Sequence, residues 1–257
     1  MKKLLSGFCV ALSMYSKIPV PAPAWTEDSM KYALCFFPVI GFLAGGLELL
    51  WLSAAKALSL SPVLYGAAAV AISELLTGGI HLDGFTDTCD ALGSFRDREK
   101  RLEIMKDPHV GAFGVLYLIL LLLLRNGLYV QLFATPSCAD ILLFGFAFAR
   151  IFGGLAIVWF PCARTSGLAR TFADGSDRAA VRRVLLAEAV LCSAGCAVLH
   201  PAAGISLFLC GAVLLPLSRR FCLKLFGGIT GDLAGFFISL FETLVLVLGV
   251  IFGMPGK

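Results

Sequence analysis

Charged residues are scarce in this chain. Asp, Glu, Lys and Arg make up 15% of its 257 residues, whereas hydrophobic residues make up 59%. Soluble globular domains carry a charge at roughly a quarter of their positions, so this composition excludes an ordinary soluble domain. The mean hydropathy of +0.90 points the same way. The chain is therefore expected to be embedded in a lipid bilayer.

The sequence also lacks the cysteine spacing of common metal and disulfide motifs. Its nine cysteines are odd in number and scattered, with no Cys-x-x-Cys pair. Cys192 and Cys196 would share a helix face, but free cysteine more often packs as a small buried hydrophobe. Neither a disulfide framework nor a zinc site is predicted. The net charge of +4 is modest, and no nucleic-acid partner is expected.

Long apolar stretches predict membrane-spanning helices. A span needs roughly 20 predominantly apolar residues. Seven stretches approach or exceed that length: 34–55, 62–80, 110–134, 138–160, 184–199, 203–217 and 232–253. The predicted fold class is therefore all-α, a polytopic helical membrane bundle of about seven spans that forms one catalytic domain over residues 1–257.

The N-terminal 33 residues begin like a signal peptide. Lys17, Pro19 and Pro21 follow where a small-residue cleavage site would be expected. We therefore expect residues 1–33 to be retained, as an interfacial or re-entrant segment.

Basic residues gather in the hydrophilic segments. Seventeen of the 21 Lys and Arg residues lie in 1–33, 81–109, 161–183 and 218–231, whereas the turns near 135–137 and 200–202 carry none. Because cytoplasmic loops retain Lys and Arg, the N-terminus and the three long loops should face the cytoplasm from a cell membrane. Every segment with plausible chemistry would then share that side.

Three aspartates distinguish the segment 81–109. On a helix, Asp83, Asp87 and Asp90 project from one narrow face. Crowded carboxylates repel one another, and a hard divalent cation such as Mg²⁺ or Mn²⁺, which prefers oxygen ligands, would relieve the repulsion. A catalytic metal held by these three acids is the favoured interpretation. The alternative is a solvated helix start with Asp83 as its N-cap.

Basic side chains follow the acids in a charged helix that should end before Pro108. As a group, Arg98, Arg101 and Lys106 would neutralise charge on a transferred phosphoryl group, although each alone fits an exposed position. Asp107 is either a further ligand or the polar end of this helix.

His81 stands about 160° around an ideal helix from Asp83, so it is not an obvious metal ligand. It either accepts a proton from an attacking hydroxyl or forms a local hydrogen bond. His200, before Pro201 on the opposite side of the membrane, is set aside.

Two further sites carry polar residues. Arg150 lies within the fourth span, where a charge is costly and therefore a functional candidate. It either reaches a phosphate or pairs with Glu74, Glu188 or Glu242. Thr230 and Asp232 open the last span, where a helix N-terminus favours anions; Asp232 is either the cap or an additional acid.

The motifs together resemble a known family. The central block runs His81-Leu82-Asp83-Gly84-x-x-Asp87-Thr88-x-Asp90, then Arg101-Leu102-Glu103-Ile104-Met105-Lys106-Asp107, then Gly111-Ala112-Phe113-Gly114. Supporting pieces are Lys17-Ile18-Pro19-Val20-Pro21, Phe37-Pro38-Val39-Ile40-Gly41, Ala163-Arg164-Thr165-Ser166-Gly167-Leu168 and Gly228-Ile229-Thr230-Gly231-Asp232. This pattern resembles, nearly from end to end, the cobalamin synthase or adenosylcobinamide-GDP ribazoletransferase family.

The resemblance implies a Mg²⁺-dependent membrane enzyme that acts on small molecules. A hydroxyl of α-ribazole, or of its 5′-phosphate, would attack the cobinamide-linked phosphorus of adenosylcobinamide-GDP, and GMP would leave. The catalytic candidates are His81, Asp83, Asp87 and Asp90. The substrate-binding candidates are Arg98, Arg101, Lys106, Asp107, Arg150, Arg164, Thr230 and Asp232. A homo-oligomer is possible.

Two other functions compete with this interpretation. Membrane phosphotransferases of the CDP-alcohol type also use aspartates on spanning helices, but their pattern expects Asp-Gly-x-x-Ala-Arg, and Asp87-Thr88 stands here instead of Ala-Arg. A transporter would also carry intramembrane charges. Its acids would be expected along a crossing path, whereas these cluster at one edge.

Overall fold

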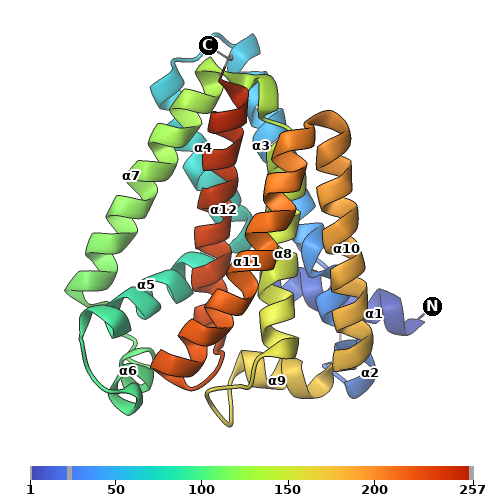
Figure 1. Cartoon of the computed structure of the whole chain (residues 1–257), viewed down its shortest axis with the longest axis vertical. Helices are drawn as coiled ribbons and strands as arrows, with labels where there is room; N and C mark the ends of the chain where they lie inside the picture. Colours follow the sequence, from blue (N-terminus) through green and yellow to red (C-terminus); the bar gives the residue numbers. More distant parts are fainter. Residues whose placement is uncertain (1, 22–24, 255–257) are drawn as a thin grey trace.

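Seven long helices form the body of the protein in the computed structural model, which describes residues 2–21 and 25–254 (Figure 1). They are α3 (Phe37–Ala57), α4 (Pro62–Thr77), α7 (Ala112–Ala134), α8 (Ile141–Trp159), α10 (Arg178–Leu199), α11 (Pro201–Phe226) and α12 (Gly231–Gly253). The shorter elements are α1 (Lys2–Tyr15), α2 (Glu27–Met30), η1 (Ala33–Phe36), α5 (Ile80–Gly93), α6 (Arg98–Ile104), η2 (Pro136–Cys138) and α9 (Leu168–Gly175). The predicted all-α class is confirmed.

Fewer helices are long and apolar enough to cross a membrane than the seven spans predicted from the sequence. Five helices among the described residues qualify, namely α7, α8, α11, α12 and the continuous stretch Ala33–Ala57. The bent pair of α4 and α5 adds a sixth if it counts as one span. The remaining predicted span, 184–199, lies within α10, which also carries Arg182, Arg183 and Glu188. Its polar residues explain why α10 does not qualify.

The N-terminal segment does not form a span of its own. Its apolar helix α1 has 14 residues, too few to cross a bilayer. The close contact at Gly7, where a Cβ would lie 3.2 Å from the carbonyl oxygen of Ser29, packs α1 against α2. The expectation that residues 1–33 form an interfacial or re-entrant segment stays a prediction. The predicted single domain over 1–257 includes residues 1, 22–24 and 255–257, which lie outside the described residues, and stays a prediction.

Two glycines redirect the chain between α4 and α5. Gly78 and Gly79 have φ angles of +68° and +75°, in the left-handed region that glycine adopts without the Cβ penalty. The two helices consequently meet at 98°. A Cβ at Gly78 would also lie 2.1 Å from Cε of Lys17. The segment predicted as the loop 81–109 thus begins with α5, a helix that turns away from α4 and across the bundle (Figure 1).

Helix α8 is the most buried helix of the bundle, and small residues allow α3 to approach it. A Cβ at Gly41 would lie 2.3 Å from the carbonyl oxygen of Phe146, and one at Gly45 would lie 2.4 Å from that of Leu142. Backbones come this close in membrane proteins where small residues line the interface, because packing rather than water exclusion drives helix association there.

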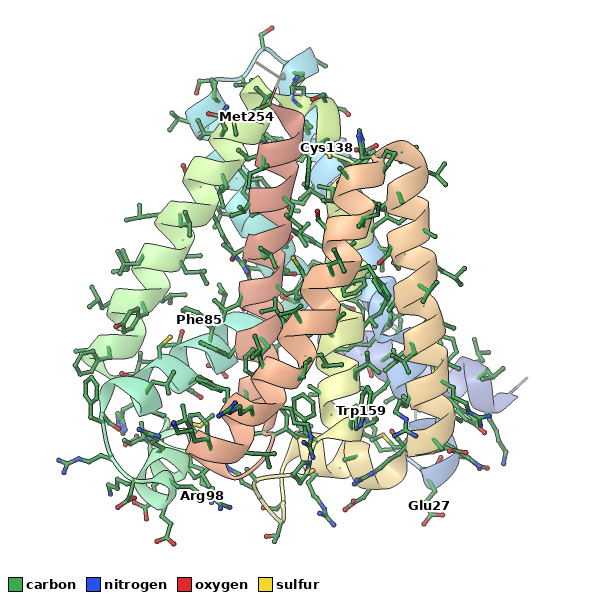
Figure 2. All side chains as sticks on the ribbon, viewed as in Figure 1. Glu27, Phe85, Arg98, Cys138, Trp159 and Met254 are labelled. Atoms are coloured by element: carbon green, nitrogen blue, oxygen red, sulfur yellow. The ribbon has the colours of Figure 1, made fainter. Side chains whose placement is uncertain are left out.

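The hydrophilic connections gather at one end of the bundle. Figure 1 shows α2, α6 and α9 at the lower end, together with the connection from α11 to α12. Figure 2 labels Glu27, Arg98 and Trp159 at this end, and Cys138 and Met254 at the other. The basic segments identified in the sequence therefore share one end, as the charge pattern requires.

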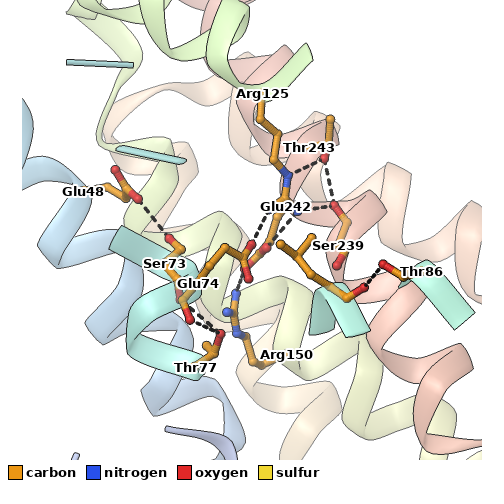
Figure 3. Close-up of polar contacts among 11 residues, drawn as sticks. Glu48, Ser73, Glu74, Thr77, Thr86, Arg125, Arg150, Ser239, Glu242 and Thr243 are labelled. Carbon is orange, nitrogen blue, oxygen red and sulfur yellow. Dashed lines mark hydrogen bonds and ion pairs between the residues drawn. The ribbon is translucent and has the colours of Figure 1, made fainter. Parts of the chain in front are cut away.

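A network of buried charges crosses the middle of the bundle (Figure 3). Arg125 of α7 is 4% exposed. It donates hydrogen bonds to Glu74 Oε1 at 2.8 Å, Glu242 Oε2 at 3.1 Å, Thr243 Oγ1 at 3.0 Å and the Ser239 carbonyl oxygen at 2.7 Å. This one guanidinium ties α4 and α12 to α7.

Arg150 of α8 joins the same network and is 1% exposed. Its Nη1 donates to Glu242 and to the Phe146 carbonyl oxygen. Of the alternatives open for this residue, the structure selects the pairing with Glu242. Two arginines and two glutamates thus neutralise one another where an unpaired charge would be costly.

Replacing Arg125 with Met should destabilise the protein strongly, because Glu74 and Glu242 would lose the cation between them. Removing one member of a buried pair costs about 3–5 kcal/mol, so the melting temperature of the detergent-solubilised protein should fall clearly. Arg220→Met, at an exposed position of α11, is the matched control. An unchanged melting temperature in Arg125→Met would contradict the role given to this network.

Candidate active site

The start of α12 lies directly against α5. A Cβ at Gly84 would be 2.6 Å from the carbonyl oxygen of Asp232, and one at Gly235 would be 3.2 Å from the Cα of His81. A side chain at Gly84 would force the two backbones apart, and one at Gly235 would be tightly packed, so these two positions allow the close approach of the helices. The contact brings Asp232 beside the acidic face of α5.

Asp87 is the centre of the acidic cluster. The carboxylates of Asp83, Asp90 and Asp232 are near enough to repel the negative charge of Asp87. Arg164 is the nearby cation that attracts this charge. Asp83 is exposed and Asp87 half-buried. The predicted grouping on one face of α5 is thus present. Tertiary packing adds a fourth acid, Asp232, which lies at least 142 positions further along the chain than the other three. Like charges at this density repel one another unless a cation intervenes.

Asp90 has other partners. Its Oδ2 accepts a hydrogen bond from the Gly111 amide at 2.6 Å, and its Oδ1 accepts one from the Gly114 amide at 2.8 Å. Gly111 is the N-cap residue of α7 and Gly114 lies in its first turn, where N–H groups without a partner in the helix favour a carboxylate. A Cβ at Gly111 would lie 2.4 Å from Oδ1. The structure therefore gives Asp90, predicted as a metal ligand, the position of a helix cap.

The three predicted ligands do not converge as a ready metal site. Asp83, Asp87 and Asp90 do not form a group whose ligand atoms all lie within 4.8 Å of one another in the described part of the chain. Both Asp90 oxygens are already bonded to backbone amides at the start of α7.

Arg164 reaches the acids from the loop after α8. Its Nη1 lies 3.4 Å from Asp232 Oδ2, and its Nη2 donates to the Leu102 carbonyl oxygen at 3.0 Å. The loop is held by a short parallel bridge in which Ala163 N donates to Ile229 O at 2.9 Å and Ile229 N donates to Pro161 O at 2.8 Å. Arg164 therefore connects α6, α12 and the acidic cluster.

Thr230 and His81 line the same space. Thr230 caps α12, because its Oγ1 accepts a hydrogen bond from the Leu233 amide at 3.1 Å. His81 is 4% exposed, and its ring centroid lies 5.9 Å from that of Phe37. Its Nε2 is buried and has no hydrogen-bond partner among the described residues.

Two cavities meet at Asp83. The first, about 180 Å³, is lined by His81, Asp83, Arg164, Arg170, Thr230 and Asp232 together with apolar side chains. The second, about 690 Å³, is lined by Lys17, Gly78, Gly79, Asp83, Thr86 and apolar side chains that include Val115 and Leu118. Both contain Ile80 and Asp83, so one exposed carboxylate borders both spaces.

Sequence reasoning assigned no role to Lys17 or Arg170. Lys17 stands in the Lys-Ile-Pro-Val-Pro stretch, and Arg170 is the next arginine after Arg164. Lys17 lies inside one of the motifs that carry the family resemblance, and Arg170 lies two positions after another. A basic residue in or beside these motifs is the signal that could have identified both.

The remaining predicted substrate-binding residues line neither cavity. Arg98, Lys106 and Asp107 are exposed, and Arg101 is half-buried. The His109 amide donates a hydrogen bond to Asp107 Oδ1 at 2.9 Å, and the His109 ring contacts the same oxygen. These two interactions hold the pKa of Asp107 below its ordinary value. Arg150, bonded to Glu242 inside the bundle, also lies outside both lining sets.

Arg98 nevertheless lies over the connection from α11 to α12. A Cβ at Gly227, whose φ is +77°, would be 1.9 Å from Cζ of Arg98. The roles predicted for Arg98, Arg101, Lys106 and Asp107 stay predictions, at the rim of the site.

Comparison with known proteins gives the family. The model of the cobalamin-5-phosphate synthase family matches residues 7–250. The chain belongs to this family. It is similar to the adenosylcobinamide-GDP ribazoletransferase of Lachnoclostridium phytofermentans, with 37% identity over 242 residues that cover 92% of this chain and 90% of the relative.

Two other relatives with the same name extend the likeness. The protein of Clostridium botulinum is 33% identical over 98% of this chain and its own full length. The protein of Desulfitobacterium hafniense is 36% identical over 93% of this chain and 94% of its own. No solved structure matches the chain. The family resemblance seen in the motifs is thereby confirmed.

Asp90 and Asp83 should respond differently to truncation. Asp90→Ala removes both acceptors from the first turn of α7 and should cost roughly 1–2 kcal/mol, the scale of a lost N-cap. Asp83→Ala, at an exposed position, should change the melting temperature of the purified protein by no more than about 2 °C, because exposed substitutions rarely change stability by more than about 0.5 kcal/mol. Equal melting temperatures for the two variants would rule out the capping role.

Proposed function

We propose that the protein is an adenosylcobinamide-GDP ribazoletransferase that joins its substrate to α-ribazole or α-ribazole 5′-phosphate and releases GMP. The observation that carries this proposal is the position of Asp83 where two cavities meet, with Asp232 and Arg164 lining the smaller cavity and Asp87 in the same acidic cluster. Carboxylates and arginine around one point suit phosphoryl transfer, which depends on charge neutralisation and positioning. The shared name of the relatives supplies the substrate.

A divalent cation, Mg²⁺ or Mn²⁺, fits the crowding around Asp87. We assign Asp83, Asp87 and Asp232 as its ligands, because both carboxylate oxygens of Asp90 already accept hydrogen bonds from amides at the start of α7. When bound, such an ion neutralises and orients the pyrophosphate. The carboxylates would have to draw closer together, since they form no preassembled group of this kind in the described part of the chain.

The side chains divide the remaining work. Arg164 and Arg170 of the smaller cavity bind the phosphates of the leaving GMP portion. The attacking hydroxyl forms the new oxygen–phosphorus bond while the bond to GMP breaks. His81 lines this cavity, and its buried Nε2 bonds to no other described residue, so we assign it the role of accepting the hydroxyl proton.

In-line displacement places the nucleophile and the leaving group on opposite sides of the phosphorus. Two cavities that meet at Asp83 suit this requirement. We assign the guanosine side to the smaller cavity and the α-ribazole side to the larger cavity, where Lys17 lies. The basic connections at this end of the bundle support a site that faces the cytoplasm.

The assay uses the full-length protein in detergent with adenosylcobinamide-GDP, α-ribazole and Mg²⁺, and it measures GMP release. Asp83→Asn, Asp87→Asn and Asp232→Asn should each lose about 100-fold or more of kcat, the scale on which groups that stabilise transition-state charge act. Asp28→Asn, an exposed acid paired with Lys3, is the control and should stay active. Absence of GMP release by the folded wild type, or full activity in Asp83→Asn, would refute the proposal.

Lys17→Ala tests the assignment of the larger cavity. Loss of a binding cation there should raise the KM for α-ribazole 5′-phosphate several-fold with little change in kcat, because it removes binding shared by ground and transition states. Lys100→Ala, in an exposed pair with Glu103, is the matched control. An unchanged KM in Lys17→Ala would contradict the assignment of α-ribazole to the larger cavity.

A further inference from the structure

Three potential metal ligands meet at the end of the bundle opposite the acidic cluster. Cys138, Asp140 and His200 each offer one ligand atom, and these three atoms all lie within 4.8 Å of one another. Figure 2 labels Cys138 at this upper end, far from Arg98 and Glu27. The group is distinct from the proposed active site.

The donors are those of a transition-metal site. A thiol, a carboxylate and an imidazole are the ligands that zinc takes in proteins, usually in a tetrahedral arrangement. A cluster of acids alone would favour Mg²⁺ or Ca²⁺, whereas sulfur and nitrogen select softer ions. His200 Nε2 lies 2.8 Å from Asp140 Oδ1, a separation that needs only a small opening to admit an ion between the two atoms.

The ligands differ in exposure in a way that suits binding from water. Cys138 is fully buried. The side chains of His200 and Asp140 are 28% and 37% exposed. The thiol therefore forms the floor of the group, and the other two ligands leave a path to solvent. One coordination position remains for water, as in zinc sites with three protein ligands.

Hydrogen bonds hold the two connections that carry these ligands. Cys138 ends η2, whose Ser137 Oγ donates to the Gly253 carbonyl oxygen at 2.8 Å. His200 separates α10 from α11, and its amide donates to the Cys196 carbonyl oxygen at 2.8 Å. The ligands thus come from two connections, one between α7 and α8 and the other between α10 and α11.

We propose that Cys138, Asp140 and His200 form a zinc site that joins these two connections. Bound zinc would stabilise this end of the bundle, because binding to the folded state alone shifts the unfolding equilibrium. The proposal departs from the expectation drawn from cysteine spacing. Asp140 and His200 are 60 positions apart, and no local motif contains all three residues.

The test uses the full-length protein in detergent, stripped of metal with a chelator and then titrated with Co²⁺ or Zn²⁺. A cobalt ion bound through a thiolate shows a ligand-to-metal charge-transfer band in the near ultraviolet, which an all-oxygen site such as the acidic cluster cannot produce. We expect this band to saturate at one ion per chain. Zinc should displace the cobalt and raise the melting temperature.

Three variants locate the site. Cys138→Ser should abolish the band. Asp140→Asn and His200→Gln should weaken binding by more than the roughly 10–100-fold that loss of an outer-shell partner costs. His200→Gln keeps a donor for Asp140, so it separates metal binding from the hydrogen bond between these residues. Cys192→Ser, a buried thiol of α10, is the control and should keep the band.

Two results would overturn the proposal. The first is a folded wild type that shows no cobalt–thiolate band, which would leave only a hydrogen bond between Asp140 and His200 beside a packed cysteine. The second is a band that persists in Cys138→Ser or disappears in Cys192→Ser, which would place the thiolate elsewhere. Neither readout depends on ribazoletransferase activity.

Discussion

The pairing of Arg125 and Arg150 with Glu74 and Glu242 is the interaction on which the rest of the bundle depends. A charge in an apolar interior persists only if an opposite charge and hydrogen bonds replace the lost water. These four residues come from α7, α8, α4 and α12. The network therefore fixes how four helices lie relative to one another. Of these helices, α4 leads directly into α5, and α12 itself carries Asp232 of the acidic cluster.

Close backbone contacts bring the acidic residues of α5 and α12 together. Gly78 and Gly79 turn the chain from α4 into α5, and Gly84 lets α5 contact the first turn of α12. Asp232 consequently joins Asp83 and Asp87, although the sequence separates them widely. Arg164 arrives from a loop held by a single backbone bridge to Ile229. The mutual repulsion of the acids makes the cluster a natural place for a cation and for phosphate groups.

The two ends of the bundle present different chemistry. One end gathers oxygen ligands and arginines around two cavities, a set suited to phosphates and a hard cation. The opposite end brings a buried thiol, an imidazole and a carboxylate together, a set suited to a softer ion. The membrane-embedded middle, with its internally neutralised charges, separates the two.

The helical class, the apolar stretches, the shared end of the basic segments, and the face of α5 that carries Asp83 and Asp87 can all be predicted from the amino-acid sequence. These features depend on local hydrophobicity and on the helical repeat, which short windows of sequence contain. The packing of the helices was needed to find that Asp90 caps α7, that Asp232 joins the cluster, that Arg150 pairs with Glu242, and that His200 meets Cys138 and Asp140. Each of these depends on contacts between helices distant in sequence, where the available partner, and not the residue's own chemistry, decides what a side chain does.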